Sequence, residues 1–195
     1  MTDRIPETLL APLRDLGRWL EAAGMQAVIV GGIAVSFLGR PRFTQDIDAL
    51  AILAEQEWAG ALAIAANYGI VPRIEKPLEF ARRTRVLLLR HTPSKIDIDL
   101  ILGGLPFEHT AVEHGRVQKV GGVSVRLPRV EDLLIMKAVA HRPQDMQDIE
   151  GLLDAHPGAN VEDVRRWVRE FATATAMFDL IDDFERLLER RKSAD

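Results

Sequence analysis

Two apolar segments of the chain each carry two aspartates separated by one residue, Asp46-Ile47-Asp48 and Asp97-Ile98-Asp99. Alternation of polar and apolar residues predicts strands over residues 46–52 and 95–102, which puts both aspartates of a pair on one strand face. Like charges on one face repel each other, so the fold needs a positive charge beside them. A divalent cation such as Mg²⁺, which binds carboxylate and phosphate oxygens together, meets that need. A solvent-exposed edge strand with two unused carboxylates is the alternative for the first pair.

A pair of glycines, Gly31 and Gly32, follows a predicted strand over residues 26–30 and precedes a short helical stretch over residues 33–38. Glycines at such a turn let backbone N–H groups approach a ligand, and the start of a helix favours an anion. A tight turn without a ligand is the alternative for this motif taken alone. Combined with one aspartate pair and a third carboxylate from a neighbouring strand, the motif predicts a phosphate site beside two metal ions, as in-line phosphoryl displacement requires.

Composition excludes several other classes of protein. The 195 residues include no cysteine, which rules out disulfide scaffolds, thiol nucleophiles and Cys-type zinc sites. Apolar runs are far shorter than the ~20 residues of a membrane span, and the N-terminal segment lacks the apolar core of a signal peptide. We therefore expect a cytoplasmic protein that has no association with a membrane.

Charge is unevenly distributed along the chain, whose formal net charge is −4. Between Arg73 and Lys95 lie seven basic residues and two acidic ones, so the rest of the chain is strongly acidic. Such segregation is typical of a surface that faces an anion, and it slightly favours a nucleic acid as a binding partner. Solvated faces of an ordinary helix and strand are the alternative.

The order of the predicted elements indicates two parts. Strands and helices alternate in residues 1–128, and the segment 129–195 is predicted to be helical throughout. The fold class is therefore α/β (α+β): a small mixed sheet flanked by helices, with a helical C-terminal part packed on this core. Predicted helices cover residues 6–23, 55–68, 130–140, 144–156, 161–173 and 178–191, and predicted hairpins pair residues 85–91 with 95–102 and residues 116–120 with 123–127.

The glycine pair, a gap of thirteen residues and then Asp46-Ile47-Asp48 resemble the signature of the polymerase-beta-like nucleotidyltransferase superfamily. Within it, the chain is most similar to minimal bacterial nucleotidyltransferases of the AbiEii toxin type and related uncharacterised families. A helical segment over residues 131–149 is also similar to that group, and the resemblance covers roughly residues 26–153.

This resemblance implies roles for individual residues. The glycine pair would contact the triphosphate of a nucleotide, Asp46 and Asp48 would coordinate Mg²⁺, and Asp99, favoured over Asp97, would supply the third carboxylate. Lys137 would face the triphosphate from a helix, with other polar residues arranging that wall. The remaining residues implied in nucleotide binding are Arg42 (or Arg40) and Thr44 in the loop before the first pair, and Arg142, Asp145 and Asp148 beyond Lys137.

Lys137 also stands out without the resemblance, because its predicted helix is otherwise apolar. If that helix continued past Pro143, Lys137, His141 and Asp145 would share a face. A lysine that extends its stem along a helix edge to reach solvent is the alternative.

The activity implied is transfer of a nucleoside monophosphate from a nucleoside triphosphate to a hydroxyl, with Mg²⁺ as cofactor. Asp99 would also deprotonate that hydroxyl. The acceptor could be RNA (a tRNA 3′ end), a protein or a small molecule, and a toxin of this type would have an antitoxin protein as partner. The alternative is a catalytically silent binding module that keeps the fold and acts as a partner of another protein.

Overall fold

The computed structural model describes residues 6–192 and divides the chain into two compact units. The first consists of Met1–Ser36 and Pro41–Pro128, and the second of Phe37–Arg40 and Arg129–Asp195. Among residues 6–192, no helix has both the length and the apolar composition needed to cross a membrane.

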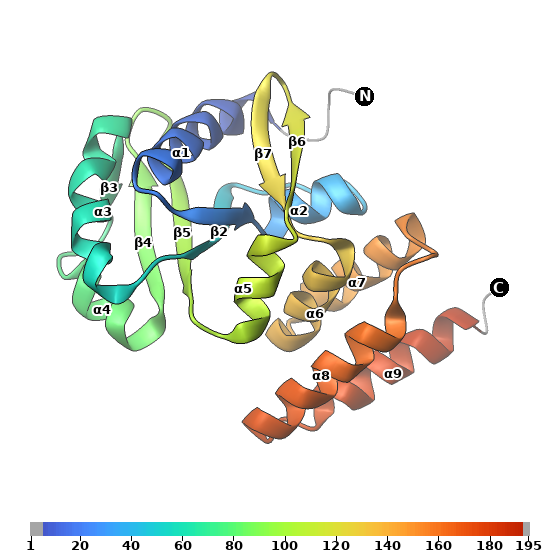
Figure 1. The fold of residues 1–195 in the computed structure, drawn as a ribbon. Coiled ribbons are helices and arrows are strands. Elements are labelled where there is room, and N and C mark those ends of the chain that lie inside the picture. Colours follow the sequence, from blue (N-terminus) through green and yellow to red (C-terminus); the bar gives the residue numbers. More distant parts are fainter. Residues whose placement is uncertain (1–5, 193–195) are drawn as a thin grey trace. The chain divides into compact units, whose positions relative to one another are not determined.

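The first unit contains a mixed five-stranded sheet with strand order β1-β2-β5-β4-β3 (Figure 1). Strands β2 and β5 at its centre run parallel, and the other neighbours are antiparallel. The mixed sheet is as predicted, and so is the hairpin that pairs β4 with β5. The strands are β1 (Gln26–Ile29), β2 (Asp46–Ile52), β3 (Ile70–Pro72), β4 (Val86–His91) and β5 (Ile96–Gly103).

Apolar side chains on the central strands hold this sheet together. Ile47 and Ala49 of β2 and Ile98 and Leu100 of β5 are fully buried, while the aspartates between them are not. Because the side-chain period of a strand is two, burying the isoleucines turns the aspartates to the opposite face. The packing of the core therefore sets the direction in which the carboxylates point.

Helices of the first unit pack around the sheet. Helix α1 contacts β1, α4 contacts β4, and α5 contacts β1 and β2. The predicted helical segment over residues 55–68 is confirmed in its bounds, with 3₁₀ turns at Glu55–Glu57 and Ala66–Tyr68 on either side of an α-helix of eight residues. The helices are α1 (Leu10–Ala22), α2 (Gly31–Leu38), α3 (Trp58–Ala65), α4 (Pro77–Thr84) and α5 (Pro106–Glu113).

A two-stranded hairpin of β6 (Arg116–Val120) and β7 (Val123–Leu127) completes the first unit. Gly121 and Gly122 form its turn with φ of +51° and +79°, a backbone conformation that side chains other than glycine rarely adopt. The hairpin is confirmed with the predicted bounds.

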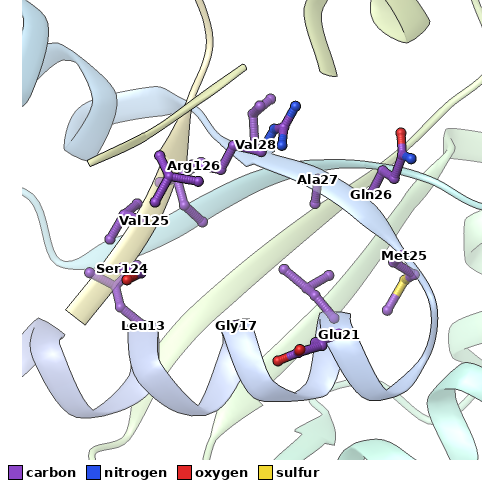
Figure 2. A pocket seen from close by; sticks show the side chains of 13 residues that line it. Leu13, Gly17, Glu21, Met25, Gln26, Ala27, Val28, Ser124, Val125 and Arg126 are labelled. Carbon is purple, nitrogen blue, oxygen red and sulfur yellow. The ribbon is translucent and has the colours of Figure 1, made fainter. Parts of the chain in front are cut away.

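A hollow of about 500 Å³ lies between α1, β1 and β7, as Figure 2 shows. Its lining is largely apolar, and a side chain in place of Gly17 would meet no other atom within 4 Å. None of the predicted site residues lines this hollow.

The second unit is helical, with α6 (Val130–Ala140), α7 (Pro143–Ala155), α8 (Val161–Thr175) and α9 (Asp179–Lys192). Contacts of α6 with α7 and α8, and of α8 with α9, bury a shared apolar core. Helix α6 ends where His141 takes a φ of +53°, and α7 begins two residues later at Pro143. The helix predicted to start at residue 130 therefore does not continue past Pro143.

Candidate active site

The register of the two parallel strands places the aspartate pairs side by side. Asp46 lies opposite Asp97, and Asp48 lies opposite Asp99. Since all four positions share one face of the sheet, their carboxyl groups form two adjacent rows. The four aspartates singled out in the sequence are thus brought together by the pairing of two strands that are about fifty residues apart.

The glycine pair lies directly beside the first aspartate pair. A Cβ atom on Gly31, whose φ is +60°, would collide with the carboxylate of Asp48. At Gly32, a Cβ would come within 2.8 Å of the Thr44 hydroxyl and 3.0 Å of the Arg42 guanidinium. Both glycines are therefore required by close approach, and they belong to the first turn of α2, two residues before the predicted start of that helix.

The loop before β2 is fastened to this turn by hydroxyl groups. Thr44 Oγ1 donates a hydrogen bond of 2.9 Å to Asp46 Oδ1. Ser36 Oγ of α2 donates to the carbonyl of Gly32 (2.9 Å) and accepts from the backbone N–H of Arg42 (3.3 Å). Gly31, Gly32, Arg42, Thr44, Asp46 and Asp48 therefore form one contiguous group in the first unit.

The second aspartate pair is bound by arginines. Arg73, one residue beyond β3, donates from one guanidinium nitrogen to Asp97 Oδ2 (2.7 Å) and from another to Asp99 Oδ1. Arg90 donates to the other oxygen of Asp97 (2.6 Å). One guanidinium thus bridges the two carboxylates on β5.

These neighbours give the two aspartates opposite pKa shifts. The hydrogen bond from Arg90, helped by Arg73, holds the pKa of Asp97 below its ordinary value despite partial burial. Burial raises the pKa of Asp99; Arg73 opposes this increase, and the nearby charges of Asp46 and Asp97 add to it. Of the two, Asp99 has the carboxylate that accepts a proton more readily.

A hollow of about 540 Å³ opens over these side chains. Its volume lies in the range typical of pockets for small ligands. Asp46, Asp97 and Asp99 line it together with Thr44, Arg73 and Lys95, and so does Phe43, a strongly exposed aromatic residue. Groups of both charges thus face a space that could hold a nucleotide.

The remaining predicted residues form a cluster in the second unit. Lys137 Nζ lies 2.8 Å from Asp145 Oδ1 and 2.8 Å from Asp148 Oδ2, and all three side chains are buried. Arg142 Nε donates to Asp145 Oδ2 (2.6 Å). Burial alone would raise the pKa of Asp145, but hydrogen bonds from Arg142 and Lys137 outweigh it and hold that pKa below its ordinary value. The alternative that Lys137 extends to solvent is wrong, whereas its contact with a triphosphate stays a prediction.

Basic residues between Arg73 and Lys95 are largely engaged within the chain. Arg82 pairs with Glu55 (3.0 Å), and Lys76 pairs with Glu79 (3.2 Å). Arg85 donates to the carbonyls of Leu102 and Gly103. The sequence signal for Arg73 is the need for a positive charge beside paired aspartates. The sequence predicts a metal ion in that place, whereas the structure supplies an arginine on the second pair.

Comparison with known families decides the classification. Residues 14–194 match the family model described as the nucleotidyl transferase AbiEii toxin of a type IV toxin–antitoxin system. The chain belongs to the AbiEii nucleotidyl transferase family. It is therefore a nucleotidyltransferase, and the resemblance noted in the sequence is confirmed.

Several solved structures share the fold of this AbiEii-family chain. The antibiotic-resistance factor ANT(2″)-Ia is 16% identical with a TM-score of 0.59, covering 89% of this chain and 97% of that one. ANT(2″)-Ia in complex with adenylyl-2″-tobramycin gives a TM-score of 0.57 at 16% identity, with coverages of 86% and 99%. An antigenic nucleotidyltransferase-like protein from Paracoccidioides brasiliensis is 15% identical with a TM-score of 0.54, covering 93% and 94%. A comparison with curated proteins finds no match.

The donor groups of this AbiEii-family site suit a hard divalent cation. Asp46, Asp48 and Asp99 offer carboxylate oxygens, the ligands that Mg²⁺ prefers, and Gly31 leaves the space that the Asp48 carboxylate takes up. Within residues 6–192, however, no three acidic or histidine side chains converge closely enough to form a ready metal site. Arg73 holds Asp99 instead. The residues thus fit Mg²⁺ in the kind of donor group they offer, and one of them, Asp99, is bound to an internal cation.

Proposed function

We propose that this nucleotidyltransferase moves a nucleoside monophosphate from a nucleoside triphosphate to a hydroxyl acceptor in a reaction that requires Mg²⁺. The observation that carries the proposal is the strand register that sets Asp46 and Asp48 beside Asp97 and Asp99. The hollow of about 540 Å³, which Asp46, Asp97 and Asp99 line, supplies space for the triphosphate, and the glycine turn lies beside Asp48 and the Thr44 hydroxyl.

The glycine turn and the aspartates have separate roles in this reaction. Backbone N–H groups at Gly31 and Gly32 face the triphosphate, because the first turn of a helix leaves such donors unpaired. Asp46, Asp48 and Asp99 would hold Mg²⁺, which when bound neutralises charge developing on the phosphate oxygens. The acceptor oxygen attacks the α-phosphorus, the bond to the bridging oxygen of the β-phosphate breaks, and pyrophosphate leaves.

Asp99 takes the proton of the acceptor hydroxyl. A general base works best when its pKa lies towards the working pH, and burial raises the pKa of Asp99 whereas Arg90 lowers that of Asp97. This difference supports Asp99 over Asp97 as the third carboxylate.

An RNA hydroxyl, such as a tRNA 3′ end, is the proposed acceptor. The excess of basic residues between Arg73 and Lys95 supports it, although most of them are already engaged within the chain. A small molecule is the competing acceptor, since one structure of the same fold is described with adenylyl-2″-tobramycin. From the family's type IV toxin–antitoxin assignment we further propose an antitoxin protein as partner and the cytoplasm as location.

The test is transfer of label from each of the four α-labelled nucleoside triphosphates, with Mg²⁺, to total RNA, to protein and to aminoglycosides. Asp48→Asn is compared with wild type, and Asp179→Asn, an exposed aspartate of the second unit, is the matched control. We expect Mg²⁺-dependent labelling of RNA by wild type and by the control only. Labelling that persists in Asp48→Asn would contradict the assignment of the site.

One observation favours the alternative of a catalytically silent module: Arg73 already supplies a positive charge to two of the carboxylates. In that case, the same assay would give no label in any acceptor.

A further inference from the structure

We propose that Arg73 is a positioning residue that exchanges partners. Without ligand its guanidinium holds Asp97 and Asp99; when Mg²⁺ and a triphosphate enter the hollow, it releases Asp99 and binds a phosphate oxygen. This inference rests on the proposed function, because it concerns the same carboxylates.

The backbone of Arg73 is fixed, whereas its side chain crosses the sheet. Its N–H donates to the carbonyl of Leu88 on β4 (3.0 Å). Leu88 in turn lies opposite Asp99 in the register of β4 with β5. The anchor point therefore stays in line with Asp99, and several rotatable bonds let the guanidinium swing from it without moving the strands.

The two carboxylates differ in what they keep when the Arg73 guanidinium moves away. Asp97 keeps a second arginine, because Arg90 binds it through a separate pair of hydrogen bonds. Asp99 lies near the charges of Asp46 and Asp97, so it attracts any further cation that enters the hollow. Because the Arg73 pairs are partly exposed to solvent, their net strength is small. A doubly charged ion can therefore displace Arg73 from Asp99.

A triphosphate in the same hollow would give the released guanidinium a new partner. Arg73 lines it together with Ser94 and Lys95. The planar fork of an arginine matches two oxygens of a phosphate as well as it matches a carboxylate. The triphosphate that arrives with the cation thus replaces the carboxylate that the cation takes.

Binding of Mn²⁺, followed by electron paramagnetic resonance of the free ion, tests this exchange without any turnover. Wild type, Arg73→Ala, Arg73→Lys and Arg90→Ala are titrated with Mn²⁺ alone. In a second series, binding of the preformed Mn²⁺–tripolyphosphate complex to each protein is measured by isothermal titration calorimetry. The matched control is Arg90→Ala, since it removes the same charge from the same Asp97 but makes no contact with Asp99 in the described contacts.

We expect Arg73→Ala to bind Mn²⁺ alone about tenfold more tightly, because a competing positive charge is gone. In the presence of tripolyphosphate it should lose about tenfold in affinity for the polyphosphate, because the phosphate partner is gone. Arg73→Lys should lie between wild type and Arg73→Ala in both measurements. Arg90→Ala should stay within about twofold of wild type in both.

Equal effects of Arg73→Ala and Arg90→Ala would contradict the inference, since plain loss of charge would then explain them. Unchanged or weaker Mn²⁺ binding by Arg73→Ala, beside a wild type that binds Mn²⁺, would contradict this inference alone. A wild type that binds no Mn²⁺ even with tripolyphosphate would contradict the proposed function as well. If Arg73→Ala does not fold, as judged by thermal unfolding, the same comparison is made with Arg73→Gln.

Discussion

Two clusters in this chain place one cation between two carboxylates, and they differ chiefly in their access to solvent. In the second unit, Lys137 lies between Asp145 and Asp148, with side chains 4%, 0% and 2% exposed. In the first unit, Arg73 lies between Asp97 and Asp99, with side chains 24%, 31% and 34% exposed. A cationic side chain between two aspartates thus occurs once in the buried core and once at the wall of a hollow.

This difference in solvent exposure indicates which cluster can exchange a partner for a ligand. A buried ion pair cannot lose one member without leaving an uncompensated charge in a medium of low polarity. A partly exposed pair is screened by water and weak, so another ion can replace one partner. We therefore expect removal of Lys137 to destabilise the second unit, and we expect the Arg73 cluster to be open to exchange.

The largest expected effect is on stability. Lys137→Met should lower the free energy of unfolding by about 3–5 kcal/mol, because the buried carboxylates of Asp145 and Asp148 would lose the ammonium group that lies between them. Chemical denaturation measures this, with Lys76→Met as the matched control for an exposed lysine–glutamate pair. A loss below about 1 kcal/mol for Lys137→Met would remove the distinction between the two clusters.

A second prediction separates the two carboxylates on β5. Asp99→Asn should lower kcat/KM for nucleotidyl transfer by roughly a hundredfold or more, since both a metal ligand and the proton acceptor are lost. Asp97→Asn should cost less than about tenfold, because Arg90 and Arg73 already engage that carboxylate. If Asp97→Asn lost more kcat/KM than Asp99→Asn, Asp97 would be the third carboxylate.

The pH dependence of activity should reflect the raised pKa of Asp99. As an acceptor of protons it must be ionised, so kcat/KM should fall with decreasing pH at a higher pH than the ~4 of an ordinary aspartate. Arg73 lowers this pKa, so Arg73→Ala should move the acid limb further up. If the acid limb of the kcat/KM profile lies at the same pH in wild type and in Arg73→Ala, Asp99 is not the titrating base.

The pH dependence of stability should run through Asp145, whose pKa is lowered in the fold. Its contribution is fully present above the pKa of an unfolded aspartate, ~4, and is lost as the pH falls through the lower pKa of the folded state. The difference in unfolding free energy between wild type and Asp145→Asn should therefore shrink on acidification below about pH 4. A difference that stays constant down to pH 2.5 would argue against an ionised Asp145 in the native cluster.

The smallest expected effect is on the stability of the first unit. Arg73→Ala should change the free energy of unfolding by less than about 1 kcal/mol, since its ion pairs are partly exposed. The same denaturation experiment used for Lys137→Met measures it. A loss as large as that of Lys137→Met would make Arg73 a structural residue.

Local patterns in the sequence were enough to predict the central elements of the fold. Alternation predicts β2 with its observed bounds, and the glycine turn predicts the hairpin of β6 and β7. The largely apolar segment 130–140 marks α6, also with its observed bounds. Strand β3 and helix α4 were missed, because β3 has only three residues and ends in a proline and α4 has only eight residues, which is short for recognition from a sequence pattern.

Long-range features of the candidate site could not be predicted in the same way. That Asp46 lies opposite Asp97 depends on parallel pairing, which is set by the shared core and not by either strand. Arg73 reaches Asp97 and Asp99 from the position directly after β3, a strand that was missed. The partners of Lys137 come from α7 and not from a continuous helix, because His141 ends α6 in a left-handed conformation.

The most direct test is a crystal structure with Mn²⁺ and a non-hydrolysable nucleoside triphosphate, using the anomalous signal of the metal. The account predicts anomalous peaks in contact with Asp46, Asp48 and Asp99, and a guanidinium of Arg73 that has left Asp99 for a phosphate oxygen. It predicts no peak between Asp145 and Asp148, where Lys137 should remain. A triphosphate bound without metal at Asp46 and Asp48, or a metal that replaces Lys137, would contradict it.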